Sequence, residues 1–250
     1  MENFRKMENR LGEKFITYEG YEIEIVQYFN AKNCTIKFND NTIRYNIQYD
    51  KIKKGKVKNF NHKSILKIGY IGNGVYNSKN NYNIYKTWKR MFDRCHNLKI
   101  QSKNITYIGC YVDECWYNFQ NFAKWYEENW KIYMEIWALD KDILVKGNKV
   151  YSPETCCLVP REINNLFPKA NSIRGHYPIG VSKNKNKFRV FCCLNNKQVN
   201  IGTFKTPELA FQAYKTAKEA YIKEVADEWK NQIAENVYQA MYNYNVEITD

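Results

Sequence analysis

Within residues 11–58, three stretches alternate between apolar and polar side chains with a period of two, the pattern of half-buried β-strands. Tyr21–Val26 and Cys34–Phe38 alternate in this way. The turn residues Asn39–Asn41 then lead into a third alternating stretch, Thr42–Tyr45, at the spacing of a hairpin. These patterns predict a small β-barrel at the start of the chain.

The basic tail of this region and the segment that follows it are polar and lack this alternation. Residues 51–58 carry five lysines, which either contact phosphate groups or form a solvated, charged loop. Residues 59–83 are rich in Asn, Gly and Lys, a composition that predicts an extended linker. Their glycines do not match a phosphate-binding loop, because no Gly-Lys-Ser/Thr follows.

From residue 84 the apolar period becomes helical. One face of the first helix carries Tyr85, Trp88, Met91, Phe92 and Cys95. A second aromatic helix is predicted over residues 116–130. We expect both apolar stripes to be core, with the basic flank of the first helix available to DNA.

The charge balance points to a partner. The chain has 39 Lys and Arg against 26 Asp and Glu, a formal net charge of +13. This favours nucleic acid over a membrane, because no basic amphipathic helix stands out. Residues 1–10 lack the apolar core of a signal peptide, and no stretch approaches the roughly 18 apolar residues of a membrane span. We therefore expect a cytoplasmic protein without a membrane partner.

The eight cysteines form no Cys-x-x-Cys pair, so a standard zinc ribbon is not predicted. Cys95, Cys110, Cys115 and Cys156 could meet at one tetrahedral zinc if the fold brought them together. Reduced thiols that act as small buried hydrophobes are the preferred interpretation. We do not expect a structural Zn²⁺.

Residues 139–167 contain the clearest candidate chemistry. They read Leu-Asp-Lys-Asp, a turn at Gly147 and Asn148, Tyr-Ser-Pro-Glu-Thr-Cys-Cys and then Arg-Glu-Ile-Asn-Asn-Leu-Phe. This stretch resembles the β-β-α metal motif of the HNH endonucleases of bacteriophages and mobile elements, and the aromatic helices before it resemble the segment preceding that motif. The resemblance implies a bacterial host, and Asp140 and Asn164 as ligands of Mg²⁺ or Mn²⁺.

The same resemblance leaves the catalytic base open. Lys141 stands where the family has a histidine, and Thr155 where it has an asparagine that steadies the loop. A lysine serves as a base only if its pKa falls by several units, which the neighbouring Asp140 and Asp142 oppose. Loss of a base costs ~10²–10⁴-fold in rate. Either Lys141 is catalytic, or another group such as His96 replaces it, or cleavage is lost.

Residues 175–244 predict three strands and a long helix. Lys183–Lys187 form a basic turn, and Thr206 caps a helix with an Ala and Tyr stripe that extends toward Tyr244. The Gly-Val start, the Ile-Gly-Thr-Phe strand and the Ala-x-x-Ala-Tyr helix resemble the DNA-binding domain of the Apetala and ethylene-response-factor family. Phage homing endonucleases of the HNH class often carry this domain.

In that family the sheet lies in the major groove of double-stranded DNA. Alternation over residues 188–193 puts the even-numbered side chains toward the helix and the odd-numbered ones outward. The resemblance then implies DNA contacts by Ser182, Lys183, Asn184, Lys185, Asn186, Lys187, Arg189, Phe191, Gln198 and Asn200. The amides among them suit adenine, so an AT-rich target is one interpretation. The alternative is a small sheet that packs on the rest of the protein.

Together these patterns predict an α+β protein. Its segments are a small SH3-like β module (11–58), a linker (59–83), an HNH-like module with a β-β-α metal motif (84–168), and an Apetala-type module with an extended C-terminal helix (175–244). We expect metal-dependent cleavage of double-stranded DNA, with Asp140 and Lys141 as the catalytic residues. The alternative is a degenerate HNH scaffold that acts as a DNA-binding regulator, or as an inhibitor of a host defence protein. The oligomeric state and the target sequence are not predicted.

Overall fold

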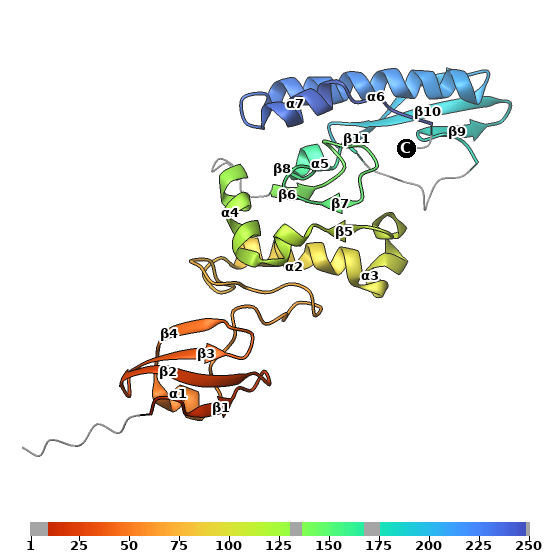
Figure 1. Cartoon of the computed structure of the whole chain (residues 1–250). Helices are drawn as coiled ribbons and strands as arrows, with labels where there is room; N and C mark the ends of the chain where they lie inside the picture. Colours follow the sequence, from red (N-terminus) through yellow and green to blue (C-terminus); the bar gives the residue numbers. More distant parts are fainter. Residues whose placement is uncertain (1–9, 131–136, 168–175, 249–250) are drawn as a thin grey trace, which may run out of the picture. The chain divides into compact units, whose positions relative to one another are not determined.

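The computed structural model describes residues 10–130, 137–167 and 176–248, and it shows a protein of mixed α and β structure (Figure 1). Its internal contacts divide the chain into two units. The first comprises residues 1–108 and 112–124, and the second comprises residues 109–111 and 125–250. Among the described residues, every helix is too short or too polar to span a lipid bilayer.

The first unit begins with an antiparallel sheet in the order β1-β2-β3-β4. The elements are β1 (Lys14–Ile16), β2 (Glu22–Asn30), β3 (Asn33–Phe38), β4 (Ile43–Ile47) and the short helix α1 (Tyr49–Lys53). The alternating side chains Ile23, Ile25, Ile36 and Phe38 are buried against Ile52 of α1. The three predicted strands are confirmed, and β1 was not predicted.

This sheet is open, so the expectation of a closed barrel is wrong. Within the described residues, β1 pairs with β2 and β4 pairs with β3, but the two edge strands do not pair with each other. The chain leaves β4 directly into α1, and the turn after α1 takes the place beside β1. There the backbone N–H of Tyr18 donates to the carbonyl of Gly55 at 2.9 Å. Gly55 has a φ of 63°, and a Cβ on it would lie 2.7 Å from the Ile16 carbonyl.

Residues 59–83 were expected to be an extended linker. They are largely irregular, but hydrogen bonds hold them to the start of α4. The N–H of Tyr70 donates to the carbonyl of Tyr117 at 2.9 Å. The Gln120 side chain closes a loop over Tyr76, donating to its carbonyl at 2.9 Å and accepting its N–H at 3.0 Å. The segment is therefore a packed connection.

The helical part of the first unit has an aromatic core. Its elements are α2 (Tyr82–His96), α3 (Leu98–Lys103), the 3-10 turns η1 (Ile105–Tyr107) and η2 (Glu114–Tyr117), and the first residues of α4 (Phe119–Asn129). The predicted stripe on α2 is confirmed by the burial of Trp88, Met91 and Phe92. The indole N–H of Trp88 donates to the Trp116 carbonyl at 2.7 Å and ties α2 to η2. The second aromatic helix begins at Phe119, three residues later than predicted, because η2 precedes it.

The second unit contains a ββα segment (residues 137–167) and a three-stranded sheet with two helices. The ββα segment consists of β6 (Trp137–Asp140), β7 (Val150–Tyr151), β8 (Cys157–Pro160) and α5 (Arg161–Asn164), and the short strand β5 (Tyr111–Val112) precedes it. Strand β6 pairs antiparallel with β8, so that Asp140 lies opposite Cys157. Strands β6 and β8 pair and α5 follows them, but the two strands are not joined by a simple turn, because a third strand, β7, lies between them in sequence and pairs with β5.

The last part of the chain forms a sheet in the order β11-β10-β9, covered by a helix. Its elements are β9 (Val181–Asn184), β10 (Lys187–Leu194), β11 (Lys197–Phe204), α6 (Pro207–Trp229) and α7 (Glu235–Tyr242). Thr206 caps α6 as predicted, with its hydroxyl accepting the N–H of Leu209 at 3.3 Å. Val190 and Cys192 are buried against Ala210 and Tyr214 of α6.

The C-terminal helix is not extended to Tyr244 as expected. It ends at Trp229, and α7 returns beside α6, as Figure 1 shows. The carbonyl of Trp229 accepts the N–H groups of Gln232 and Ile233 at 2.8 and 3.1 Å, which closes the turn. Ile233 is buried there, so apolar burial compensates for the interrupted helix.

The ββα segment and the two C-terminal helices share one hydrophobic core. It joins Val159 and Ile163 of the ββα segment to Ile222 of α6 and Val237 of α7. All four side chains are at most 1% exposed. These two parts, predicted as separate modules, therefore stabilise each other.

Candidate nucleic-acid interface

The outward face of the β9–β11 sheet gathers most of the side chains predicted to contact DNA. On β10, Val190 and Cys192 are buried under α6, whereas Arg189 is exposed and Phe191 is half-buried. The predicted alternation of β10 is therefore confirmed. The backbone of the strand fixes this face, because successive side chains of a strand point to opposite sides.

Strand pairing extends the face to the neighbouring strands. Arg189 lies opposite Ser182 of β9, and Phe191 lies opposite Asn200 of β11. Residues directly opposite each other project to the same side of a sheet. The face, which we call the outward face, consists of Ser182, Asn184, Lys187, Arg189, Phe191, Cys193, Gln198, Asn200 and Thr203.

The other predicted contact residues lie at its margin. Lys185 and Asn186 form the turn between β9 and β10, and Lys185 has a φ of 54°. Lys183 lies opposite Phe188, a side chain that packs toward α6, so Lys183 projects to the helix side. Lys183, Lys185 and Asn186 are all exposed. Among the predicted contact residues on the strands, Lys183 is therefore the one whose side chain projects to the helix side of the sheet and not outward.

Thr203 belongs to the outward face but was missed by sequence reasoning. Regular alternation from Gln198 and Asn200 would put Gly202 outward. The register of β10 and β11 shifts between Val190 and Phe191, which leaves Ile201 as an extra residue. This β-bulge reverses the alternation, so Thr203 lies opposite Arg189. No sequence signal other than Gly202, a residue common at bulges, indicated the shift.

The outward face is polar and cationic. The guanidinium carbon of Arg189 lies 5.9 Å from the centroid of the Phe191 ring, a cation–π contact that orients the arginine along the strand. Lys187 lies opposite Asn184, next to the basic turn. The arrangement offers positive charge at one end of the face, and toward the other end the Phe191 ring with the amide of Asn200 opposite it.

The second candidate site is the end of β6. Asp140 Oδ1 accepts the N–H groups of Asp142 and Ile143 at 2.7 and 2.8 Å, an arrangement typical of a carboxylate that closes a turn. Burial raises the pKa of Asp140 above its ordinary value, although these two hydrogen bonds act in the opposite direction. The carboxylate is thus largely removed from water at the end of a strand.

Lys141 is buried and fully engaged in the turn after β6. Its side chain is 6% exposed, and Nζ donates to Asp142 Oδ2 at 2.8 Å and to the Asn148 carbonyl at 2.5 Å. The ammonium also lies 6.0 Å from the centroid of the Tyr151 ring. In this geometry Lys141 is a hydrogen-bond donor that holds the turn together.

Asn148 and Thr155 fasten the rest of this loop. The Asn148 amide donates to the carbonyls of Lys141 and Val150 at 2.8 and 2.7 Å, and its oxygen accepts the Val150 N–H at 3.0 Å. The Thr155 hydroxyl donates to the same Val150 carbonyl at 2.8 Å. Sequence reasoning recognised Asn148 as a turn residue and missed this bridging role.

Asn164 lies at the end of α5 and is half-buried. Within the part of the chain that the structure describes, its side-chain amide makes no hydrogen bond. Asp140 and Asn164 offer oxygen donors, which suit a hard divalent cation. No group of three or more His, Cys, Asp or Glu side chains positioned for a metal occurs among residues 10–130, 137–167 and 176–248.

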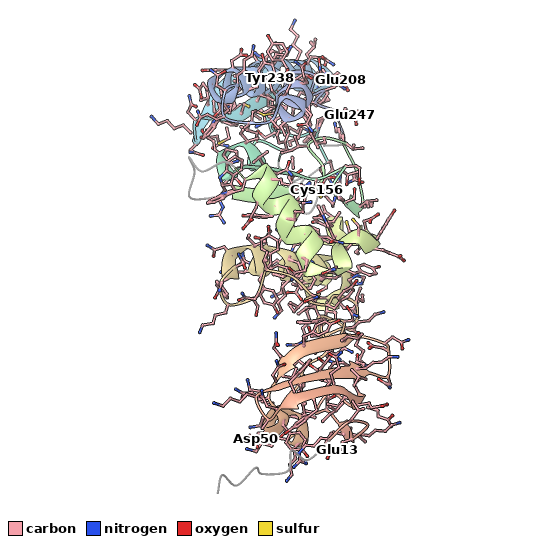
Figure 2. All side chains as sticks on the ribbon, turned by 60° about the vertical axis from the view of Figure 1, so that its left-hand side comes forward. Glu13, Asp50, Cys156, Glu208, Tyr238 and Glu247 are labelled. Carbon is pink, nitrogen blue, oxygen red and sulfur yellow. The ribbon has the colours of Figure 1, made fainter. Side chains whose placement is uncertain are left out.

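The cysteines next to this site are buried thiols. Burial raises the pKa of Cys156, labelled in Figure 2, to about 12, and it also raises the pKa of Cys157. A thiol with so high a pKa is a poor nucleophile and a poor metal ligand at neutral pH. Cys156 and Cys157 therefore contribute packing to the ββα segment.

No family model, curated protein or solved structure matches this chain.

Proposed function

We propose that this chain binds double-stranded DNA through the outward face of the β9–β11 sheet, as a protein of the phage HNH endonuclease lineage. One observation carries the proposal. A face of the sheet that takes no part in the core gathers Arg189, Lys187 and five polar side chains of the neighbouring strands. The resemblance of residues 175–244 to the Apetala and ethylene-response-factor domain supports the same use of the sheet.

The chemistry of this face separates into two kinds of contact. Lys187 and Arg189, with Lys183 and Lys185 at the margin, pair with phosphates and set affinity and salt dependence. Asn184, Gln198, Asn200 and Thr203 present amides and a hydroxyl, which form hydrogen bonds with base edges in the major groove. Phe191 offers an apolar ring between them, suited to a thymine methyl group.

Duplex binding at several salt concentrations tests the proposal. Arg189→Ala is expected to lower the affinity for duplex DNA about tenfold and to reduce the slope of log K against log salt by about 0.9, the effect of one phosphate contact. Lys223→Gln on α6, which covers the opposite side of the sheet, removes the same charge and is expected to leave both values unchanged. Equal losses of affinity in the two variants would show that only the net charge matters, which would contradict the proposal.

Metal-dependent phosphodiester hydrolysis is a second candidate function. It is supported by the Asn164 amide, which has no partner in the described residues, on the helix that follows β8. Asp140 and Asn164 would hold Mg²⁺ or Mn²⁺, and the ion when bound would supply positive charge to a phosphate. Lys141 is already engaged by Asp142 and Asn148, so we assign it to the structure of the turn rather than to proton transfer.

Plasmid cleavage with Mg²⁺ or Mn²⁺ separates the two candidates. Nicking that is lost in Asp140→Ala and Asn164→Ala would establish a metal nuclease that uses another base. Binding without nicking in the wild type supports the alternative, a degenerate HNH scaffold that acts as a DNA-binding regulator or as an inhibitor of a host protein. Because Asp140 closes a turn, thermal unfolding of each variant is the control for a folded protein.

A further inference from the structure

A cavity of about 450 Å³ lies in the first unit, between the end of β4, α1 and the irregular segment that follows. Sites for small molecules in proteins span about 300–1,000 Å³, so this cavity has the size of a ligand site. It lies in the first unit and shares no residue with the outward face or the ββα segment. It is therefore a candidate for a separate binding event.

The cavity is lined by an excess of positive charge. Arg44, Lys51, Lys56 and Lys58 contribute to its wall, together with one carboxylate, that of Glu19. The Glu19 carboxylate accepts the backbone N–H of Asn59 at 2.9 Å. Within the described ranges of the chain, Lys51, Lys56 and Lys58 form no ion pair. The cavity therefore attracts an anion.

The remaining wall is apolar and aromatic. Ile47, Val57, Phe60 and Ile71 line it. The Arg44 guanidinium stacks over Phe60, with its central carbon 3.9 Å from the ring centroid, and donates to the Lys58 carbonyl at 2.7 Å. Burial lowers the pKa of Arg44, and an anion bound beside it would offset the loss of hydration.

Hydrogen bonds fix the cavity wall before any ligand is bound. Asn59 is buried, its amide donates to Asp40 at 2.7 Å, and its oxygen accepts the Asn61 N–H at 2.7 Å. His62 lies edge-on to Tyr21, with the two ring centroids 5.8 Å apart. A preorganised wall lowers the entropy that binding would cost.

We propose that this cavity binds a nucleoside monophosphate, either free or at the end of a DNA strand. The cavity is many times larger than the ~30 Å³ that a water molecule occupies in liquid, so a small inorganic anion would leave the apolar wall uncovered. A planar base fits beside the stacked Arg44 and Phe60, since nucleobases stack on aromatic rings and guanidinium planes. The lysines take the phosphate. The proposal does not depend on duplex binding by the outward face.

Titration calorimetry on the full-length chain tests it with five probes. These are dAMP, dTMP, thymidine, inorganic phosphate and a 5′-phosphorylated oligothymidylate. We expect saturable binding of dAMP or dTMP, and at least tenfold weaker binding of thymidine and inorganic phosphate. Tighter binding of the oligonucleotide than of dTMP would identify a strand end as the source, and similar binding would identify the free nucleotide.

Two variants locate the site. Lys56→Gln/Lys58→Gln is expected to weaken nucleotide binding at least tenfold, whereas Lys32→Gln/Lys37→Gln, two exposed lysines of the same module outside the cavity, leaves it unchanged. Phe60→Leu keeps the charge and is expected to weaken nucleotide binding without affecting inorganic phosphate. The proposal is overturned if no nucleotide binds saturably, if inorganic phosphate binds as tightly as dTMP, or if the cavity variants bind like the control. Loss of duplex binding alone in Lys56→Gln/Lys58→Gln would also overturn it, in favour of a phosphate contact to duplex DNA.

Discussion

The turn after β6 and the outward face of the β9–β11 sheet are both rich in polar side chains, but they use them in opposite ways. In the turn, Lys141, Asn148 and Thr155 direct their polar atoms at neighbouring backbone and side-chain groups. On the outward face, Asn200, Gln198 and Arg189 are exposed at the surface of a sheet whose core lies on the other side. Polar groups already paired within the fold stabilise it, whereas unpaired ones remain available to a partner.

This difference indicates which of the two family resemblances gives the stronger support for a function. The resemblance to HNH enzymes implies Asp140 and Asn164 as metal ligands, and Lys141, which follows Asp140 and stands at the position of the base, is buried and paired with Asp142. The resemblance to the Apetala and ethylene-response-factor domain rests on a sheet whose outward side chains are exposed. Duplex binding is therefore the better supported half of the proposal, and hydrolysis is the half that requires a group not yet identified.

The largest effect on stability is expected when Lys141, the buried side chain of the turn after β6, is replaced. Lys141→Met removes the ammonium that donates to Asp142 and to the Asn148 carbonyl, and breaking a buried ion pair costs about 4 kcal/mol. We expect this loss in the free energy of unfolding measured with denaturant. Lys79→Met, at an exposed lysine of the first unit, is the control. An unchanged stability together with lost nicking would instead make Lys141 a catalytic residue.

A second variant tests whether the ββα segment and the β9–β11 sheet unfold together. Ile222→Ala removes a fully buried side chain of α6 that packs on the ββα segment, at a cost of about 3 kcal/mol. Because the core is shared, hydrogen exchange should increase in β8 and β10 in the same step. Exchange that increased in only one of the two strands would show that they are independent modules.

Two asparagine variants compare a polar side chain that is hydrogen-bonded within the fold with one that is exposed on the outward face. Asn148→Ala removes three hydrogen bonds of the loop and is expected to destabilise the protein by about 2 kcal/mol without changing the intrinsic affinity for DNA. Asn200→Ala is expected to change stability by less than about 0.5 kcal/mol, as is usual at an exposed site. Thermal unfolding and gel-shift assays of both variants check the pair. A stability loss at Asn200 would mean that the outward face is structural.

The smallest effect is expected from single polar side chains of the outward face, and it distinguishes base contacts from phosphate contacts. Asn200→Ala is expected to lower the affinity for a preferred duplex by about 1.4 kcal/mol, within the range of one base contact, and to relax the preference at one base pair. Thr203→Ala should act in the same direction, since Thr203 belongs to this face. Selection of preferred duplexes from a random pool, repeated with each variant, measures the change. A uniform loss across all sequences would assign these residues to phosphate contacts.

Much of the local structure was readable from the sequence. The alternation in Cys34–Phe38 predicted the burial of Cys34, Ile36 and Phe38 but not that of Thr35. The alternation in residues 188–193 predicted the burial of Val190 and Cys192, and the helical spacing in α2 predicted its aromatic stripe. These predictions succeed because each period is fixed by the geometry of a single strand or helix. Closure of the N-terminal sheet could not be predicted in this way, since it depends on whether two edge strands meet.

The sequence alone was enough to predict the strands β2–β4 and β9–β11, the capped helix α6 and the charge that favours a nucleic-acid partner. The tertiary structure alone decided that Lys141 is paired, that a bulge turns Thr203 outward, and that α7 folds back to share a core with the ββα segment. It also decided that β4, α1 and the following segment enclose a basic cavity. The physical reason is common to all four: a side chain's pairing and exposure depend on neighbours distant in sequence, which a local period does not encode.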